Sequence, residues 1–285
     1  MRRTSIGLRR GTIVALLGLA LEVPARADLP PELASACGDA VKGARAARVV
    51  GRTQGETIYL VTAKAGARLY SVTGGNEDPC GLPPVCTAFD ARALATARGK
   101  LQASGAAASA QVVAAQACRE DACPRLLVVQ TGSGLRNVAG AIRVPDGCEP
   151  RLRTLALDRR HDAVHLMCST SAGAGDIQAH LVYRVADALL VNLLSFDGGS
   201  TQLVSPSERA DGACTIGPVG AIAITKIDGA PAWRVTRAPD AGQSGASCKQ
   251  QRAIEEDLRW DAKAGAFDPI GAPRPLERDT CDCRR

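Results

Sequence analysis

Short segments of alternating polarity, separated by turn residues, recur along this chain and constrain its fold more than any other feature. The first pair is 58–62 and 68–73, joined by the turn Ala63–Ala67. Apolar or β-branched residues at every second position favour strands, because successive strand side chains point to opposite faces. Two such strands joined by a short turn predict a β-hairpin. Six similar units follow, over 112–131, 135–144, 155–168, 181–196, 222–236 and 258–270.

The predicted fold is therefore mainly β, with an antiparallel, hairpin-built, disulfide-stapled body. Asp228-Gly229 separates two of the alternating segments, and Asp-Gly in this setting is a strong hairpin signal. Evenly spread hairpins are typical of a sandwich, a barrel or a propeller-like body. No repeat of fixed period is found, which weighs against the propeller but leaves both a sandwich and a propeller-like body open.

Helices are expected in two places. The Ala-rich stretch 31–47 predicts a short helical N-terminal part. Residues 90–101 predict a second helix, because Asp90 can accept hydrogen bonds from the first free N–H groups and the apolar residues recur on one face. Residues 104–110, Ser-Gly-Ala-Ala-Ala-Ser-Ala, predict a flexible join and a possible domain boundary.

The first 27 residues have the three parts of a secretory signal peptide. Four arginines precede an uncharged, largely apolar run of ten residues, Thr12–Leu21, and Ala25-Arg26-Ala27 then provides a cleavage site. This run is too short to span a bilayer, which needs about 20 residues. We therefore expect export to the periplasm or the extracellular space, with a mature region of 28–285. Lipid attachment at Cys37 is disfavoured, because charged residues separate this cysteine from the apolar run.

The mature region is close to neutral. The signal peptide holds five arginines and one glutamate, which leaves +2 of the chain's +6 for residues 28–285. A nucleic-acid-binding protein is expected to carry a clustered basic surface, and no such cluster is found. The sequence predicts no nucleic-acid partner and, after processing, no transmembrane anchor.

All eleven cysteines lie in the mature region. In an exported chain this number predicts a disulfide framework rather than metal ligands. Eleven is an odd number, so one cysteine is left free or forms an intermolecular bond. They are Cys37, Cys80, Cys86, Cys118, Cys123, Cys148, Cys168, Cys214, Cys248, Cys281 and Cys283.

Spacing suggests how these cysteines pair, because hairpin ends bring Cα atoms within about 7 Å. The predicted local pairs are Cys80–Cys86, Cys118–Cys123, Cys148–Cys168 and Cys214–Cys248. The remaining prediction ties Cys37 to Cys281 or Cys283. That bridge would close the longest loop and would stabilise the fold most in the chain-entropy model.

One motif resembles a zinc site. His161-Asp162-Ala163-Val164-His165 is similar to the zincin pattern H-E-x-x-H, and His180 is the third histidine of the chain. Histidines four apart can share a zinc ion on a helix, but on a strand they lie about 13 Å apart. The alternation around Val164 predicts a strand, so we expect His161 and His165 not to share a metal.

Other features point to structure rather than chemistry. No G-x-S-x-G nucleophile elbow and no phosphate-binding loop is present. The acidic run Glu255–Asp257 is expected to be a solvated strand face. Trp233 and Trp260 each lie on a predicted strand and are expected to pack in the core.

The sequence therefore predicts an exported, disulfide-stabilised β-rich protein without a cofactor. Its most favoured role is a non-catalytic binding or envelope-associated module. The alternative is an exported hydrolase that uses His161, His165 and His180, with or without zinc.

Overall fold

The structure is a computed structural model and describes most of residues 29–284. The described residues are 29–53, 55–74, 83–116, 123–172, 175–186, 189–200, 213–216, 221–237, 252–279 and 281–284. The predicted signal peptide lies outside these residues.

One short helix, two 3₁₀ turns and eighteen strands make up the described part. The elements are α1 Pro31–Cys37, η1 Gly38–Val41, β1 Ala44–Thr53, β2 Glu56–Ala63, β3 Gly66–Thr73, β4 Val85–Gly99, β5 Ala108–Ala115, β6 Arg125–Gln130, η2 Leu135–Asn137, β7 Val138–Arg143, β8 Glu149–Ala156, β9 Asp162–Ala172, β10 Gly175–Ala186, β11 Leu189–Ser200, β12 Ala213–Ile216, β13 Ala221–Ile227, β14 Ala230–Arg237, β15 Arg252–Asp261, β16 Ala266–Pro269, β17 Arg274–Asp279 and β18 Cys281–Arg284.

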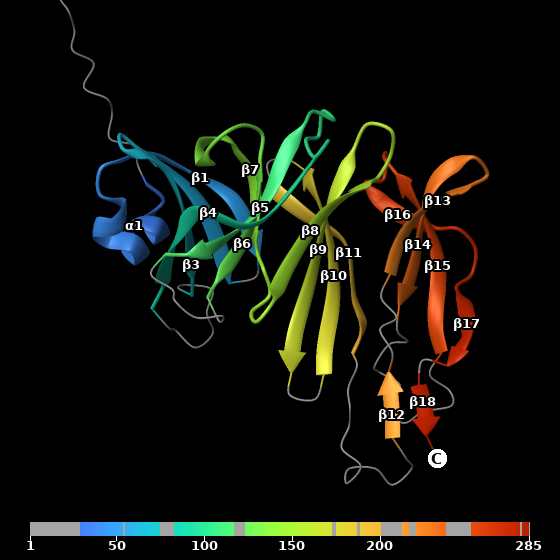
Figure 1. Cartoon of the computed structure of the whole chain (residues 1–285). Coiled ribbons are helices and arrows are strands. Elements are labelled where there is room, and N and C mark those ends of the chain that lie inside the picture. The colour runs from blue at the N-terminus through green and yellow to red at the C-terminus, as the bar shows by residue number, and fades with distance from the viewer. Residues whose placement is uncertain are drawn as a thin grey trace, which may run out of the picture.

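Three antiparallel sheets stand side by side in chain order (Figure 1). The first has seven strands in the order β1 to β7, and the second has four in the order β11-β10-β9-β8. The third contains β13, β14, β15 and β16, with β17 also paired to β15. β12 pairs separately with β18. Nearly every neighbour pair is a sequence-adjacent hairpin, as the alternating segments predict.

The first sheet curls until its first and last strands come together. The backbone of Gly51 on β1 approaches the carbonyl of Ala141 on β7 so closely that a Cβ at position 51 would lie 2.0 Å from that oxygen. The guanidinium of Arg48 donates a hydrogen bond to the carbonyl of Val138, also on β7. The sheet is therefore nearly closed.

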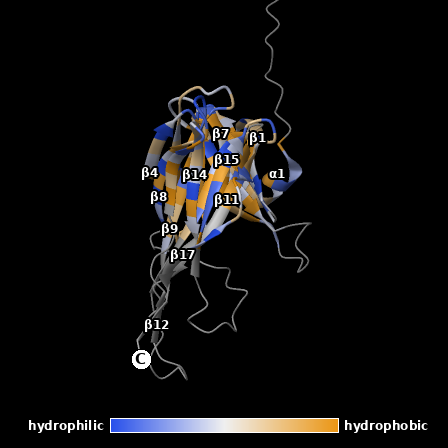
Figure 2. Cartoon of the chain, turned by 90° about the vertical axis from the view of Figure 1, so that its right-hand side faces the viewer, coloured by the Kyte–Doolittle hydropathy of each residue, from blue (hydrophilic) through white to orange (hydrophobic). Residues whose placement is uncertain are grey.

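Four buried clusters hold the layers together, and Figure 2 shows hydrophobic and hydrophilic residues alternating along the strands. The first sheet encloses one cluster, which includes Phe89. The helix α1 packs on the outer face of this sheet through a second cluster, which includes Leu33. A third, around Leu166, joins the first sheet to the second. The fourth, around Trp233, joins the second sheet to the third.

The mainly antiparallel β fold is thus confirmed. The Asp228-Gly229 hairpin is an instructive case, because both residues have positive φ, 53° and 75°. This is the backbone of the two-residue turn that matches the right-handed twist of strands, and it explains why Asp-Gly is favoured there.

The helix predicted over 90–101 is wrong, because these residues belong to β4, which pairs with β3 and β5. Ala, Leu and Arg have high intrinsic helix propensity, but sheet pairing overrides it here. The decisive pattern has a period of two: exposed side chains alternate with half-buried ones from Arg92 to Gly99. Leu94, assigned to the apolar face of the helix, is 51% exposed.

The short helical N-terminal part is confirmed, but it is shorter than predicted. α1 and η1 end at Val41, and the strand β1 begins at Ala44. Gly38 and Gly43, both with positive φ, lie at the two breaks. The prediction extended the helix because the Ala-rich composition continues into β1.

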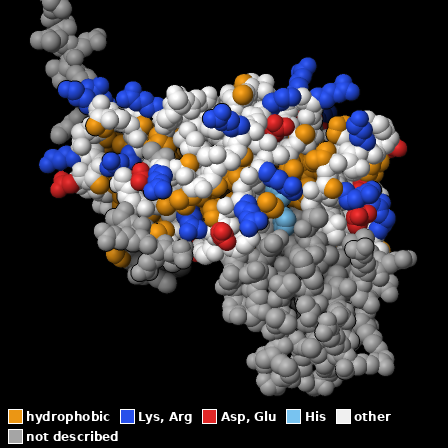
Figure 3. Space-filling model, in the orientation of Figure 1, with side chains coloured by type: hydrophobic (Ala, Val, Ile, Leu, Met, Phe, Trp, Pro, Cys, Tyr) orange, Lys and Arg blue, Asp and Glu red, His pale blue; other side chains and the backbone are white. Residues whose placement is uncertain are grey.

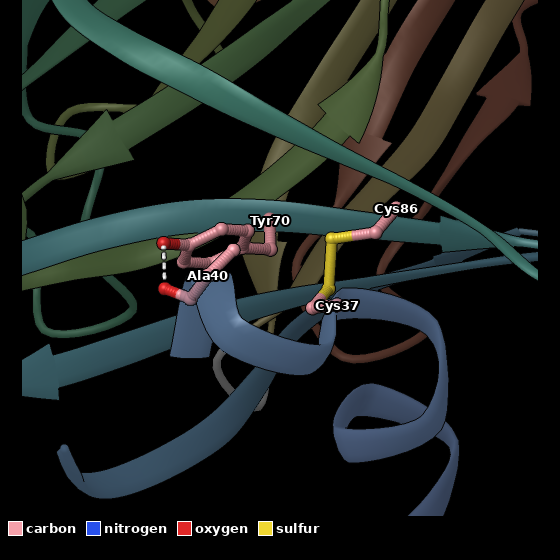
Figure 4. Close-up of a disulfide and its surroundings, with 4 residues drawn as sticks. All are labelled: Cys37, Ala40, Tyr70 and Cys86. Carbon is pink, nitrogen blue, oxygen red and sulfur yellow. Dashed lines mark hydrogen bonds between the residues drawn. A yellow bond between two sulfur atoms is a disulfide. The ribbon is translucent and has the colours of Figure 1, made fainter. Parts of the chain in front are cut away.

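Two disulfides link described cysteines, and one of them corrects the predicted pairing. Cys148–Cys168 forms as predicted. Cys37 bonds to Cys86, so the pair Cys80–Cys86 and the bridge from Cys37 to the C-terminal tail are both wrong. Figure 4 shows this disulfide joining the end of α1 to β4, beside the hydrogen bond that Tyr70 donates to the carbonyl of Ala40.

The other cysteine pairs stay predictions. Cys123 is disulfide-bonded, and its predicted partner Cys118 lies outside the described residues. Cys80 and Cys248 also lie outside them. On the backbone, Cys214 in β12 is in register with Cys283 in β18.

Residues 104–110 cover part of the connection between β4 and β5 and the first residues of β5. Those two strands are paired in one sheet. Within the described residues, no helix combines the length and apolar character that a bilayer span requires.

Candidate functional site

His161 lies in the turn that precedes β9, not on a helix. Asp158 holds this turn together, because its carboxylate accepts hydrogen bonds from the backbone N–H groups of Arg160 and His161. The ring Nδ1 of His161 lies 2.9 Å from the same carboxylate, and Nε2 lies 3.2 Å from the carbonyl oxygen of Ala103. Partial burial raises the pKa of Asp158, but these hydrogen bonds outweigh it, and the pKa is lowered overall.

His165 lies within β9 and faces the third sheet in a separate network. Its side chain is fully buried, and that of His180 on β10 is 3% exposed. His165 Nε2 is 3.0 Å from His180 Nδ1, and the two rings stack with centroids 5.1 Å apart. Nε of Arg153, on β8, donates to His165 Nδ1 at 2.8 Å.

These contacts determine the protonation of His165. Arg153 always carries its protons, so His165 Nδ1 must be the acceptor and its Nε2 must hold the proton. That proton is donated to Nδ1 of His180. Burial lowers the pKa of His165 to about 3, with the charges of Arg153 and His180 adding to the effect. Burial also lowers the pKa of His180.

The structure therefore brings together His165 and His180, but not His161. Within the described residues, no group of three or more His, Cys, Asp or Glu side chains could hold a metal ion. The strand predicted around Val164 is confirmed as β9. His161 and His165 are therefore not placed one turn apart on a helix.

A second feature is a small pocket of about 150 Å³ at the junction of the three sheets. It lies between the connection that follows β4, the turn before β9, the end of β10 and the end of β15. Its polar side chains come from Gln102, His161, Asp162 and Arg184, and its walls from Leu101, Ala103, Leu157, Val185, Trp260 and Ala262.

Arg184 is the cation of this pocket. Its guanidinium lies over the ring of Trp260, with the central carbon 5.5 Å from the ring centroid. The turn at Gly265 is also close to it, since a Cβ at this position would lie 2.7 Å from Nη2. Its Nε is buried and has no hydrogen-bond partner. Within the described residues, no carboxylate forms an ion pair with Arg184.

Asp162 is the anion of the pocket. One of its oxygens, Oδ2, accepts a hydrogen bond of 2.8 Å from the backbone N–H of Lys100. This bond ties the turn before β9 to the end of β4. The pocket is thus lined by one positive side chain, Arg184, and one negative side chain, Asp162, together with the Trp260 ring and aliphatic side chains.

The two tryptophans have different environments. Trp233 is 1% exposed and donates a hydrogen bond of 2.7 Å from Nε1 to the carbonyl oxygen of Ala156, as expected of a core residue. Trp260 is only partly buried and lines the pocket. The core-packing prediction is confirmed for Trp233, and Trp260 packs at the edge of the same cluster.

The acidic run also differs from expectation. Asp257 is 6% exposed and contacts Arg234 at 2.8 Å and Arg274 at 2.6 Å. The hydrogen bond from Arg234, assisted by that from Arg274, lowers the pKa of Asp257 despite its burial. This run is thus an ion-pair network of the third sheet rather than a simple solvated face.

Sequence reasoning identified His161 but missed Arg184, because its role depends on residues that are distant in the sequence. Arg184 occurs in an ordinary strand pattern on β10, and neither Trp260 nor Gly265 is near it along the chain. No protein-family model matches the chain, and no curated protein matches its sequence.

Proposed function

We propose that this chain is an exported, disulfide-stabilised binding module that has no catalytic activity of its own. The observation that carries the proposal is the pocket that contains Arg184 and Trp260. It offers a charged hydrogen-bond donor, an acceptor and apolar walls in a small concave site, which are the features of a ligand site.

The side chains that line the pocket support binding rather than catalysis. Its described lining contains no hydroxyl, thiol or amine that could act as a nucleophile. Both ring nitrogens of His161 are already engaged within the protein, by Asp158 and Ala103. A general base needs a free nitrogen within reach of its substrate.

Export is supported by the signal-like N-terminus and by the Cys37–Cys86 and Cys148–Cys168 disulfides, since such bonds persist mainly in oxidising compartments. The proposal includes no nucleic-acid partner. Figure 3 shows basic side chains spread over this face of the described part, with apolar surface between them.

The test is expression of the full chain in a bacterial host, followed by fractionation and intact-mass analysis with and without reductant. We expect a product outside the cytoplasm that begins at Asp28 and gains mass on reduction. Metal analysis of the same material should find no stoichiometric zinc. A reduced protein that keeps Met1 and stays in the cytoplasm, or one that holds one zinc per chain, would contradict the proposal.

A further inference from the structure

We infer that the pocket containing Arg184 and Trp260 binds a small monocarboxylate, with the carboxylate on the Arg184 guanidinium. This inference rests on the proposed binding function and names the chemical class of its ligand.

The first argument is the state of Arg184. A guanidinium in a partly buried place normally has an anionic or hydrogen-bonding partner, because burial of an uncompensated charge is unfavourable. Within the described residues the guanidinium contacts the face of Trp260 and forms no ion pair, and its Nε is buried without a hydrogen bond. A ligand carboxylate at the part of the guanidinium that lines the pocket would balance this charge.

The second argument is preorganisation. The Trp260 ring and the nearby turn at Gly265 both lie against the guanidinium and restrict the orientation of its plane. A fixed planar fork of N–H groups matches the two oxygens of a carboxylate. Little rotamer freedom is then lost on binding.

The third argument is charge. Asp162 also lines the pocket, so its carboxylate repels an incoming anion. A single Arg184 can balance a ligand with one negative charge, but a doubly charged phosphate would be repelled more strongly. The charges therefore favour a monocarboxylate over a phosphate.

The fourth argument is size and wall chemistry. A cavity of about 150 Å³ is comparable to one that accommodates benzene. Leu101, Leu157 and Val185, together with Trp260, provide apolar walls for the rest of the molecule. The ligand is thus a short-chain or small aromatic carboxylate.

The test compares propionate with propionamide, which has nearly the same shape but no charge. Ligand-observed NMR titration of the mature wild-type protein at constant ionic strength gives both dissociation constants. We expect propionate to bind at least about tenfold more tightly, the usual effect of a charge-assisted hydrogen bond. Inorganic phosphate should not displace it at equal concentration. Equal binding of amide and acid, displacement by phosphate, or no propionate binding would overturn the inference.

The variant Arg184→Gln should weaken propionate binding by at least about tenfold. Arg160→Gln is the matched control, because Arg160 is exposed on the turn next to His161 and its loss changes the net charge equally. We expect this control to bind within about twofold of wild type, as screened surface charges contribute little. Equal losses in both variants would assign the effect to overall charge and refute the site.

A measurement on the wild-type protein covers the case in which Arg184→Gln fails to fold. Phenylglyoxal modifies arginine side chains, and peptide mass mapping reports which ones react. Propionate should slow modification of Arg184 selectively, and propionamide should not. Failure of these tests with export and oxidised cysteines intact would remove the ligand class only, whereas the fractionation experiment tests export, disulfide formation and the absence of zinc.

Discussion

At the residue scale, the buried histidines His165 and His180 resist protonation. They form a hydrogen-bonded series with Arg153. A proton on His165 Nδ1 would face the Arg153 guanidinium, and the charged imidazole would lie where water is excluded. The folded state therefore holds both histidines neutral, whereas the unfolded chain can protonate them freely.

The pH dependence follows from this difference. The pKa of His165 is about 3 in the folded protein and near its ordinary 6.5 when unfolded, and that of His180 is lowered in the same direction. Between these values the unfolded state binds more protons, so the free energy of unfolding falls as pH falls below about 6.5. Each histidine contributes up to about 1.4 kcal/mol per pH unit.

Urea unfolding between about pH 5 and pH 7 measures this slope above the range where carboxylates titrate. The double variant His165→Gln/His180→Gln, which removes both buried imidazole rings, should be less stable at pH 7 but should show a flatter pH dependence. His161→Gln is the control, since it leaves the buried pair intact. An equal slope in wild type and double variant would show that the pair does not titrate as derived.

At the scale of single elements, closure of the first sheet depends on a glycine. Gly51→Ala would place a methyl group 2.0 Å from the carbonyl oxygen of Ala141 and 3.0 Å from Cδ1 of Ile58. Neither neighbour can yield easily, because one is backbone and the other is buried. We expect a loss of about 3 kcal/mol or more in urea unfolding, at the upper end of overpacking effects.

Gly134→Ala is the matched control for this change. Gly134 has a φ of 80° but nothing within 4 Å of an added Cβ, so only the local conformational cost of about 1–2 kcal/mol applies. If both variants lose the same stability, backbone conformation rather than contact between β1 and β7 explains the effect.

The element scale also shows how far the sequence was informative. Hairpins such as β13–β14 were predictable because strand period and turn chemistry are both local. β4 was mispredicted, because its Ala- and Arg-rich composition favours a helix until strands β3 and β5 pair with it. Of the candidate site, only His161 carried a recognisable motif. The stacking of Arg184 on Trp260 joins two sheets, and no local pattern encodes such a contact.

The disulfides stabilise separate elements, and their loop lengths predict their effects. Cys37–Cys86 spans 49 residues and Cys148–Cys168 spans 20. In the chain-entropy model these loops correspond to about 4 and about 3 kcal/mol. The variants Cys37→Ala/Cys86→Ala and Cys148→Ala/Cys168→Ala should lose at least these amounts in urea unfolding. Wild-type stability of either variant would contradict the pairing or its structural role.

At the scale of the whole molecule, the fold is a series of layers that each depend on a neighbour for burial. Within the described residues, no disulfide joins the third sheet to the second. The attachment includes the cluster around Trp233, the hydrogen bond from its indole to Ala156, the bond from Arg153 to the carbonyl oxygen of Ile222, and the stacking of Arg184 on Trp260. The third layer should therefore be the first to detach when this interface is weakened.

Trp233→Ala tests this order of stability. The change removes a side chain that is 1% exposed, together with its hydrogen bond to Ala156 and its packing against Phe267, with ring centroids 4.6 Å apart. Truncation of a buried aromatic residue costs about 3–5 kcal/mol. Because the first two sheets keep their own clusters and the Cys148–Cys168 bond, we expect limited proteolysis to open new cleavage sites within 221–269 while a fragment containing the first two sheets survives.

Trp260→Ala, at a partly exposed position, should produce far fewer such cuts. New cleavage spread equally through the first sheet would show that the layers unfold as one cooperative unit, and the layered account of stability would then fail.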